Sequence, residues 1–319
     1  MHRINNKWKI TILAVLAALA CLLFLFYQIR GSWAFVLEER GVKLAAMVLT
    51  GTAIAISTVI FQTLSQNRIL TPGIMGLDSL YMLFQTIIIF FAGSGNALIA
   101  DKNINFMASL LLMIAFSFVL YGILFAREGV SIYFILLIGI VFGTLFQSGA
   151  SFMQMLINPN EFLIVQGKMF ASFNAVNDSV LLLAAIVLVL SLIYLSFFYK
   201  YLDVLILGRD QAINLGVPYY TLARHLLIIV SMMVSVATAL VGPVTFLGLL
   251  VANLAMQLLG TWRHSQLFAA STLISIAALV FGQWIVERIL TFSTTLSVMI
   301  NFIGGIYFIY LLMKERSHA

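Results

Sequence analysis

The stretch that decides the fold is Leu205–Asn253, which reads LILGRDQAINLGVPYYTLARHLLIIVSMMVSVATALVGPVTFLGLLVAN. A short polar segment, Gly208–Gly216, separates two long apolar runs. The second run stops at Val241–Gly248, where a glycine and a proline interrupt a helix at membrane depth. We interpret the polar segment as a surface that binds a separate soluble protein. We interpret the break as part of a pathway across the membrane.

The composition of the whole chain agrees with a membrane protein. Of the 319 residues, 63% are hydrophobic and only 9% are charged, and the mean hydropathy is +1.11. Soluble domains carry about 25% charged residues. Transmembrane barrels show short alternating segments, which are absent from this sequence. The expected fold is therefore an all-α polytopic membrane protein, with residues 1–319 forming a single transmembrane domain.

Apolar runs long enough to span a bilayer recur along the chain. A spanning helix needs about 20 apolar residues. The basic N-terminus could belong to a secretory signal, but the first run continues past Cys21 to Tyr27, which favours an uncleaved span. We predict about ten transmembrane helices, near residues 10–27, 44–64, 73–92, 105–126, 131–155, 179–199, 221–241, 243–260, 266–290 and 296–313.

The distribution of basic residues predicts the orientation of the chain. Loops on the cytoplasmic side of membrane proteins are enriched in Lys and Arg. With both termini inside, six of the 17 basic residues fall outside, namely Arg30, Arg40, Lys43, Lys102, Lys168 and Arg288. The other eleven fall inside: Arg3, Lys7, Lys9, Arg68, Arg127, Lys200, Arg209, Arg224, Arg263, Lys314 and Arg316. The loop at about 200–220 is then cytoplasmic, and the scattered charges do not form a nucleic-acid surface.

Five spans per half would make two five-helix halves of inverted topology. Pro72–Gly76 begins the third span and Gly242–Gly248 begins the eighth, which is its counterpart in that scheme. The interval 156–178 is too apolar for a free loop and predicts a short helix lying on the outer surface.

The polar segment Gly208–Gly216 predicts a short amphipathic helix. Ala212 and Leu215 are three residues apart, a spacing that puts both on one face of a helix. Gly216 suits the left-handed position that closes a helix. An ordinary turn at the membrane interface is the alternative, and the residues alone do not decide between the two.

Several motifs give this chain a resemblance to a known family. Asp210-Gln-Ala-x-x-x-Gly216 resembles the acidic-Ala-Ala-x-x-x-Gly pattern by which permeases of ABC importers bind their ATPases. Leu207–Val217 as a whole resembles the iron-chelate and cobalamin permeases, the FecCD-type family. Gly242–Leu249 resembles the Gly-x-x-x-Phe-Val-Gly-Leu segment of that family, and Arg263–Leu267 resembles its Asp-His-Arg-x-Leu loop. Gln62 and 67–76 resemble a further motif.

The sequence also departs from that family. Ala252-Asn253 stands where the family has Pro-His, and Asn67 and Arg68 are in swapped order. Ile69 replaces the first proline of the same motif. These departures resemble the branch that imports ferric siderophores of the catecholate type, in which two different permeases often pair.

The resemblance implies a type II ABC importer permease fold and three sets of functional residues. Arg40, Lys43 and Arg288 would receive acidic residues of a substrate-binding protein, although cations also anchor helix ends at the interface. The ATPase-coupling set would be Leu207, Gly208, Arg209, Asp210, Gln211, Ala212, Leu215 and Gly216. The translocation pathway or gate would include Gly242, Pro243, Thr245, Phe246, Gly248 and Asn253.

The resemblance also implies the partners and the cargo. We expect two cytoplasmic ATPase subunits, a second permease (a homologous heterodimer, or a homodimer), an extracytoplasmic binding protein, membrane lipid and no nucleic acid. The cargo would be a ferric siderophore carried across a bacterial inner membrane, with cobalamin or haem as alternatives.

An ion-coupled secondary transporter is the rival class, and Asp78 is the one acid clearly inside a span that could serve it. No phosphate-binding Gly-x-x-x-x-Gly-Lys motif occurs, so ATP and Mg²⁺ would bind the partner subunit and this chain would not be an enzyme. One cysteine and four scattered histidines predict no metal site and no cofactor in this chain.

Overall fold

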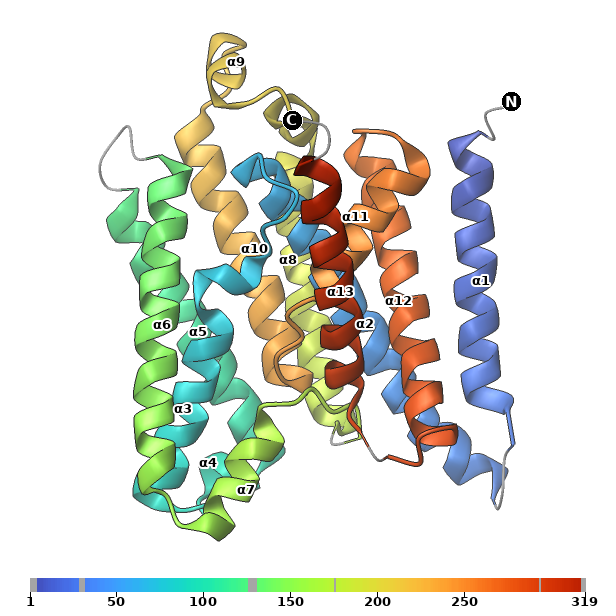
Figure 1. Cartoon of the computed structure of the whole chain (residues 1–319), viewed down its shortest axis with the longest axis vertical. Coiled ribbons are helices and arrows are strands. Elements are labelled where there is room, and N and C mark those ends of the chain that lie inside the picture. The colour runs from blue at the N-terminus through green and yellow to red at the C-terminus, as the bar shows by residue number, and fades with distance from the viewer. Residues whose placement is uncertain (1–4, 29–31, 126–130, 175, 293, 317–319) are drawn as a thin grey trace.

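The computed structural model describes residues 5–28, 32–125, 131–174, 176–292 and 294–316, nearly all of them helical (Figure 1). Among these described residues, seven helices are long and apolar enough to cross a membrane: α1 (Asn6–Phe26), α2 (Trp33–Ser65), α5 (Lys102–Leu124), α6 (Ile132–Leu156), α8 (Asp178–Leu205), α10 (Tyr219–Val241) and α12 (His264–Arg288).

Three shorter apolar helices complete the predicted set of ten. They are α3 (Leu77–Ala92), α11 (Leu247–Leu259) and the Leu296–Tyr310 part of α13 (Leu296–Arg316). The remaining elements are η1 (Pro72–Met75), α4 (Ala97–Ala100), α7 (Pro159–Lys168) and α9 (Arg209–Asn214). Helix α7 confirms the short helix predicted between residues 156 and 178.

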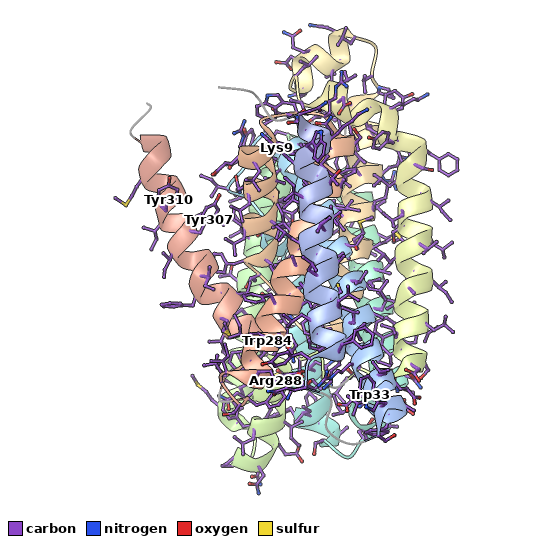
Figure 2. All side chains as sticks on the ribbon, turned by 90° about the vertical axis from the view of Figure 1, so that its right-hand side faces the viewer. Lys9, Trp33, Trp284, Arg288, Tyr307 and Tyr310 are labelled. Carbon is purple, nitrogen blue, oxygen red and sulfur yellow. The ribbon has the colours of Figure 1, made fainter. Side chains whose placement is uncertain are left out.

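The two ends of the bundle differ in what they carry. Helix α9 lies at one end, together with the start of α1 and the end of α13, whereas α4 and α7 lie at the other (Figure 1). Figure 2 shows Lys9 at the α9 end and Trp33, Trp284 and Arg288 near the α7 end. Of the basic residues used to predict orientation, Arg3, Arg30 and Arg127 lie outside the described residues.

Helices α2 and α10 form the centre of the bundle and pack against each other. Helix α2 also packs against α12, and α10 packs against α5 in the equivalent way. Helix α1 lies at the edge and buries only Ala17 and Phe24. The two central helices, α2 and α10, are therefore buried, and helices from both halves of the chain pack around them.

Each half contains one span that starts inside the bundle rather than at its surface. Helix α2 reaches the α9 end, and the chain then turns back through η1 into α3 (Figure 1). Helix α10 runs the opposite way, and the chain turns back after Gly242 into α11. The predicted correspondence of the third and eighth spans is therefore seen, with opposite directions.

Glycines allow the first of these interrupted spans to pack closely. Gly76 has φ +77°, and a methyl group there would lie 2.8 Å from the backbone nitrogen of Gly143. A methyl group on Gly139 would lie 3.1 Å from Met75 Cα. Gly139 and Gly143 thus let α6 approach the backbone of Met75 and Gly76 closely.

Candidate coupling surface and helix breaks

Helix α9 is a short helix between α8 and α10, with a glycine on each side. Gly208 (φ +94°) precedes it and Gly216 (φ +80°) follows it, as predicted for a helix closed by glycine. The Gly216 N–H donates to Ile213 O at 2.9 Å, and the Val217 N–H donates to Ala212 O at 3.0 Å. These two bonds define a Schellman motif, which satisfies the last carbonyls of the helix.

One prediction about α9 is wrong. Ala212 and Leu215 do not share a face, because Ala212 is fully buried whereas Leu215 is 63% exposed. The helix ends at Asn214, so Leu215 no longer follows helical geometry and turns outward. The exposed apolar residues at this tip are Leu207, Ile213 and Leu215, which we call the α9 surface.

A charged residue attaches α9 to the membrane helix that follows it. The guanidinium of Arg209 lies over the ring of Tyr220, 5.3 Å from the ring centroid, and also donates to the Tyr220 hydroxyl. The exposed residues Asp210 and Gln211 lie on the water-facing side. Seven of the eight predicted coupling residues are therefore exposed or shape the turn, and only Ala212 is buried. The exposed Arg209 also packs on Tyr220.

A polar network around the buried His264 lies beneath α9 and connects α8, α2 and α12. The His264 side chain is fully buried at the start of α12. Its Nδ1 lies 2.7 Å from Asp203 Oδ1 on α8, and its Nε2 lies 2.9 Å from Thr63 Oγ1 on α2. The backbone N–H of His264 also donates to Asp203 Oδ1, at 3.0 Å. The base of α9 thus has a fixed position relative to α2 and α12.

Amide side chains extend this network into the non-helical segment before η1. Gln66 Nε2 donates to Leu205 O at 2.8 Å, which links the end of α2 to the end of α8. Gln62 and Asn253 both donate to the carbonyl of Arg68, at 2.6 and 2.9 Å. Segment 66–71 is therefore held by α2, α8 and α11 together.

The helix break after α10 is in contact with segment 170–172, which follows α7. Gly242 has φ +101°, and a methyl group there would lie 3.3 Å from Phe170 O. The backbone N–H of Ser172 donates to Val241 O at 2.8 Å. Segment 170–172 therefore covers the break, and a side chain at Gly242 would be crowded by this segment and strained by the positive φ.

The two interrupted spans meet inside the bundle. A methyl group on Gly73 would lie 3.7 Å from Thr245 Cγ2 and 3.5 Å from Asp78 Oδ2. Thr238 donates to Asp78 Oδ1 at 2.7 Å, so α10 and α3 are joined at the same place. Asp78 stands in the first turn of α3, where the helix dipole favours a negative charge.

A small cavity of about 20 Å³, enough for roughly one water molecule, lies at this junction. Asp78, Thr58 and Thr245 are among the residues that line it. Among the described residues, the buried Thr58 Oγ1 has no hydrogen-bond partner. Asp78 therefore belongs to a polar junction between the two helix breaks.

The predicted pathway residues do not all face the same side. Thr245 is exposed and donates to Asn301 Oδ1 on α13 at 3.2 Å, while Phe246 packs against Gly304. Gly248 is buried against Thr58. Asn253 is 5% exposed and its side-chain amide donates to the carbonyls of Arg68 and Leu249, so it helps to hold segment 66–71.

The predicted docking cations at the α7 end also differ from expectation. Arg40 is only 8% exposed, and its Nη1 donates to the carbonyls of Phe24, Leu25 and Tyr27 at 2.9–3.1 Å. It therefore closes the end of α1 instead of presenting a free guanidinium. Lys43 pairs with Glu39 at 2.9 Å and lies 3.7 Å from Glu287.

The hydrogen-bond partners of Arg40 and His264 could not be predicted from residue types and spacing. Arg40 bonds carbonyls that belong to the preceding helix, and Asp203 has no neighbour in the sequence that marks it as a histidine partner. The sequence could have suggested His264 only through its place in the Arg263–Leu267 motif. Within the residues that the structure describes, no group of His, Cys, Asp and Glu could hold a metal ion.

A bundle of apolar helices with two interrupted spans that meet at its centre defines a polytopic membrane protein of the transport permease class. Sequence similarity to known proteins identifies the family. A model of the FecCD transport family matches residues 8–314, and the chain belongs to that family.

Two relatives named as petrobactin import permeases align with most of the chain. The petrobactin import system permease protein YclO of Bacillus subtilis is 60% identical over 312 residues, which cover 98% of this chain and 99% of the relative. The petrobactin import system permease protein FatC of Bacillus anthracis is 32% identical, over 88% of this chain and 80% of the relative.

The fold also matches a solved structure. The inward-facing conformation of a metal-chelate type ABC transporter aligns with a TM-score of 0.82, over 97% of this chain and all of that one. Their identity is 20%, so this match supports the fold alone.

Proposed function

We propose that this chain is the permease subunit of a binding-protein-dependent ABC importer that carries a ferric siderophore, of the catecholate class, into the cytoplasm. The similarity to two petrobactin import permeases is the observation that carries the choice of cargo. Petrobactin is therefore the first chelate to test. Permeases named for vitamin B12 import are 26–28% identical, so their cargo is the weaker candidate.

The geometry of α9 supports a role in energy coupling. In our proposal, cytoplasmic ATPase subunits bind the α9 surface, whose apolar side chains would insert into a groove on the partner. The His264 network would then carry movement of α9 to α2 and α12. ATP binding to the partners would shift the balance between outward- and inward-facing states.

The two helix breaks supply a place for movement inside the membrane. Non-helical backbone at membrane depth is tolerated only where protein or a cavity surrounds it. Gly73 and Thr245 line the same small cavity between the two breaks, so a change in one half would reach the other. We infer a second permease beside this one, a multi-pass location in a bacterial cell membrane, and both termini in the cytoplasm.

Uptake of radioactive iron tests this proposal. In cells that lack the chromosomal copy of this permease, a plasmid copy is expected to restore uptake of ⁵⁵Fe–petrobactin. The same cells should take up a ferric hydroxamate and radiolabelled cobalamin equally well with and without the plasmid. Restoration of cobalamin uptake, with no effect on ⁵⁵Fe–petrobactin, would contradict the siderophore assignment.

A further inference from the structure

A second cavity opens at the α7 end of the bundle and carries two positive charges. Its volume is about 390 Å³, and helices α4, α5, α7, α8 and α10 contribute to its walls. Lys102, at the start of α5, is exposed at this cavity, and Lys168, at the end of α7, is half-buried in it. The two lysines come from elements more than 60 residues apart in the sequence.

Lys168 has little inside the protein to balance its charge. Its Nζ lies 3.5 Å from Asn105 Oδ1, a long contact to a neutral group. That oxygen already accepts a hydrogen bond from Gln85 Nε2 at 3.2 Å. Burial lowers the pKa of Lys168, and the nearby charge of Lys102 lowers that pKa further. In the part of the chain that the structure describes, neither lysine pairs with a carboxylate.

The polar side chains behind Lys168 are held in place by hydrogen bonds to one another. Asn105 is buried, and its Nδ2 donates to Leu98 O at 2.6 Å and to Gln85 Oε1 at 3.0 Å. Gln85 in turn donates to Ser109 Oγ at 2.9 Å. Because these amides satisfy one another, Asn105 cannot turn to give Lys168 a better acceptor. An anion entering the cavity would therefore gain both ammonium groups without disturbing the wall.

Two of the cations predicted for docking, Arg40 and Lys43, already have partners within this chain. Arg40 is bound by three carbonyls and Lys43 is paired with acids of its own chain. A partner's carboxylate would have to displace those contacts. At Lys102 and Lys168 it would relieve repulsion between like charges instead.

We propose that Lys102 and Lys168 form a docking pocket for an acidic side chain of the extracytoplasmic binding protein. The inference rests on the proposed function, which requires such a partner at this end of the bundle in every transport cycle. A carboxylate bonded to both ammonium groups gains charge-assisted hydrogen bonds in a partly desolvated site. Docking would then depend on this pocket more than on Arg40 or Lys43.

The position of the pocket gives docking a route to the membrane pathway. Phe170, Ser172 and Val241 line the same cavity. The Ser172 N–H donates to Val241 O, one residue before the break at Gly242. A carboxylate held by Lys168 would lie beside segment 170–172, which covers the break at Gly242. Docking and opening of the break can therefore be linked through residues 168–172.

The test measures the affinity of the binding protein for the permease complex in lipid nanodiscs, by surface interferometry at several salt concentrations. The double variant Lys102→Gln/Lys168→Gln is expected to bind at least about tenfold more weakly and with a smaller salt dependence, as for loss of close charge pairs. Lys7→Gln, which removes one exposed lysine from the start of α1 at the opposite end of the bundle, is the matched control and should bind within about twofold of wild type. Equal affinity of the double variant and wild type would overturn the inference.

A second measurement protects against variants that fold poorly. A carbodiimide joins a lysine amine to a nearby carboxylic acid as an amide and takes up the lost oxygen as its urea. We expect a cross-link from Lys168 or Lys102 to an acidic peptide of the binding protein, identified by mass spectrometry. Lys168→Arg/Lys102→Arg should retain affinity but lose that cross-link. Cross-links from Lys43 alone would contradict the pocket.

The possible results distinguish a failure of the docking pocket from a failure of the proposed importer function. No binding of any purified binding protein to the wild-type complex would count against the proposed function. Binding that is unaffected by the double variant would count against the pocket alone. A loss seen only in nanodiscs that contain phosphatidylglycerol, and not in phosphatidylcholine, would show that a lipid headgroup occupies the pocket, which also overturns the inference.

Discussion

Leu215→Glu is expected to abolish ATP-driven uptake while the permease still inserts and folds. The Leu215 side chain is 63% exposed at the tip of α9, so the change removes little internal packing. Burying a leucine in a partner's groove contributes about 1.5–3 kcal/mol, and burying a carboxylate there costs more. We therefore expect binding of the ATPase to weaken by at least about 100-fold. Co-purification of the tagged permease with its ATPase measures this directly.

A control with the same added charge separates the α9 surface from its surroundings. Ser265 is exposed in the first turn of α12, at the same end of the molecule. A glutamate suits that position because the start of a helix favours a negative charge. Ser265→Glu should therefore retain ATPase binding and uptake. Loss of both activities in the control, or their survival in Leu215→Glu, would contradict α9 as the coupling surface.

Gly76→Ala is expected to have the largest effect on folding. Gly76 has φ +77°, a conformation that costs a residue with a side chain about 1–2 kcal/mol. The added methyl would also lie 2.8 Å from the Gly143 nitrogen, so η1 and α6 would have to separate. Overpacking of this kind costs about a further 1–3 kcal/mol. We expect little monodisperse protein in size-exclusion chromatography and a clearly lower unfolding temperature.

Gly305→Ala is the matched control for this prediction. Among the described atoms, nothing lies within 4 Å of a methyl group at Gly305, and the position is helical. Alanine in a helix is more favourable than glycine by roughly 1 kcal/mol. Gly305→Ala should thus elute as wild type does and unfold at the same temperature or higher. A Gly76→Ala protein of unchanged stability would show that η1 and α6 do not pack as closely as described.

Most of the fold could be predicted from the sequence because the membrane imposes simple rules on it. Apolar runs of about 20 residues mark the spans, since every spanning backbone must satisfy its own hydrogen bonds. Gly242-Pro243 and Pro72-Gly73 mark the two interruptions because they break helices locally. The closing role of Gly216 followed from the same kind of local chemistry, and the structure confirms it.

The site was only partly predictable, because its details depend on contacts between distant residues. Ala212 and Leu215 separate because α9 ends one residue before Leu215, which spacing alone does not show. Arg40 looks like a free cation in the sequence but bonds carbonyls of the preceding helix. Lys168 looks like one more flanking cation until the fold places it beside Lys102.

The most direct test of the central claim is uptake by proteoliposomes that contain the purified transporter, with the ATPase partners facing the lumen. ATP is enclosed in the lumen, and binding protein loaded with ⁵⁵Fe–petrobactin is supplied outside. We predict accumulation of iron only when both the ATPase partners and ATP are present, and none with the Leu215→Glu permease. Accumulation driven by an ion gradient, by this chain without any ATPase, would contradict coupling through α9 and would favour an ion-coupled carrier that uses Asp78.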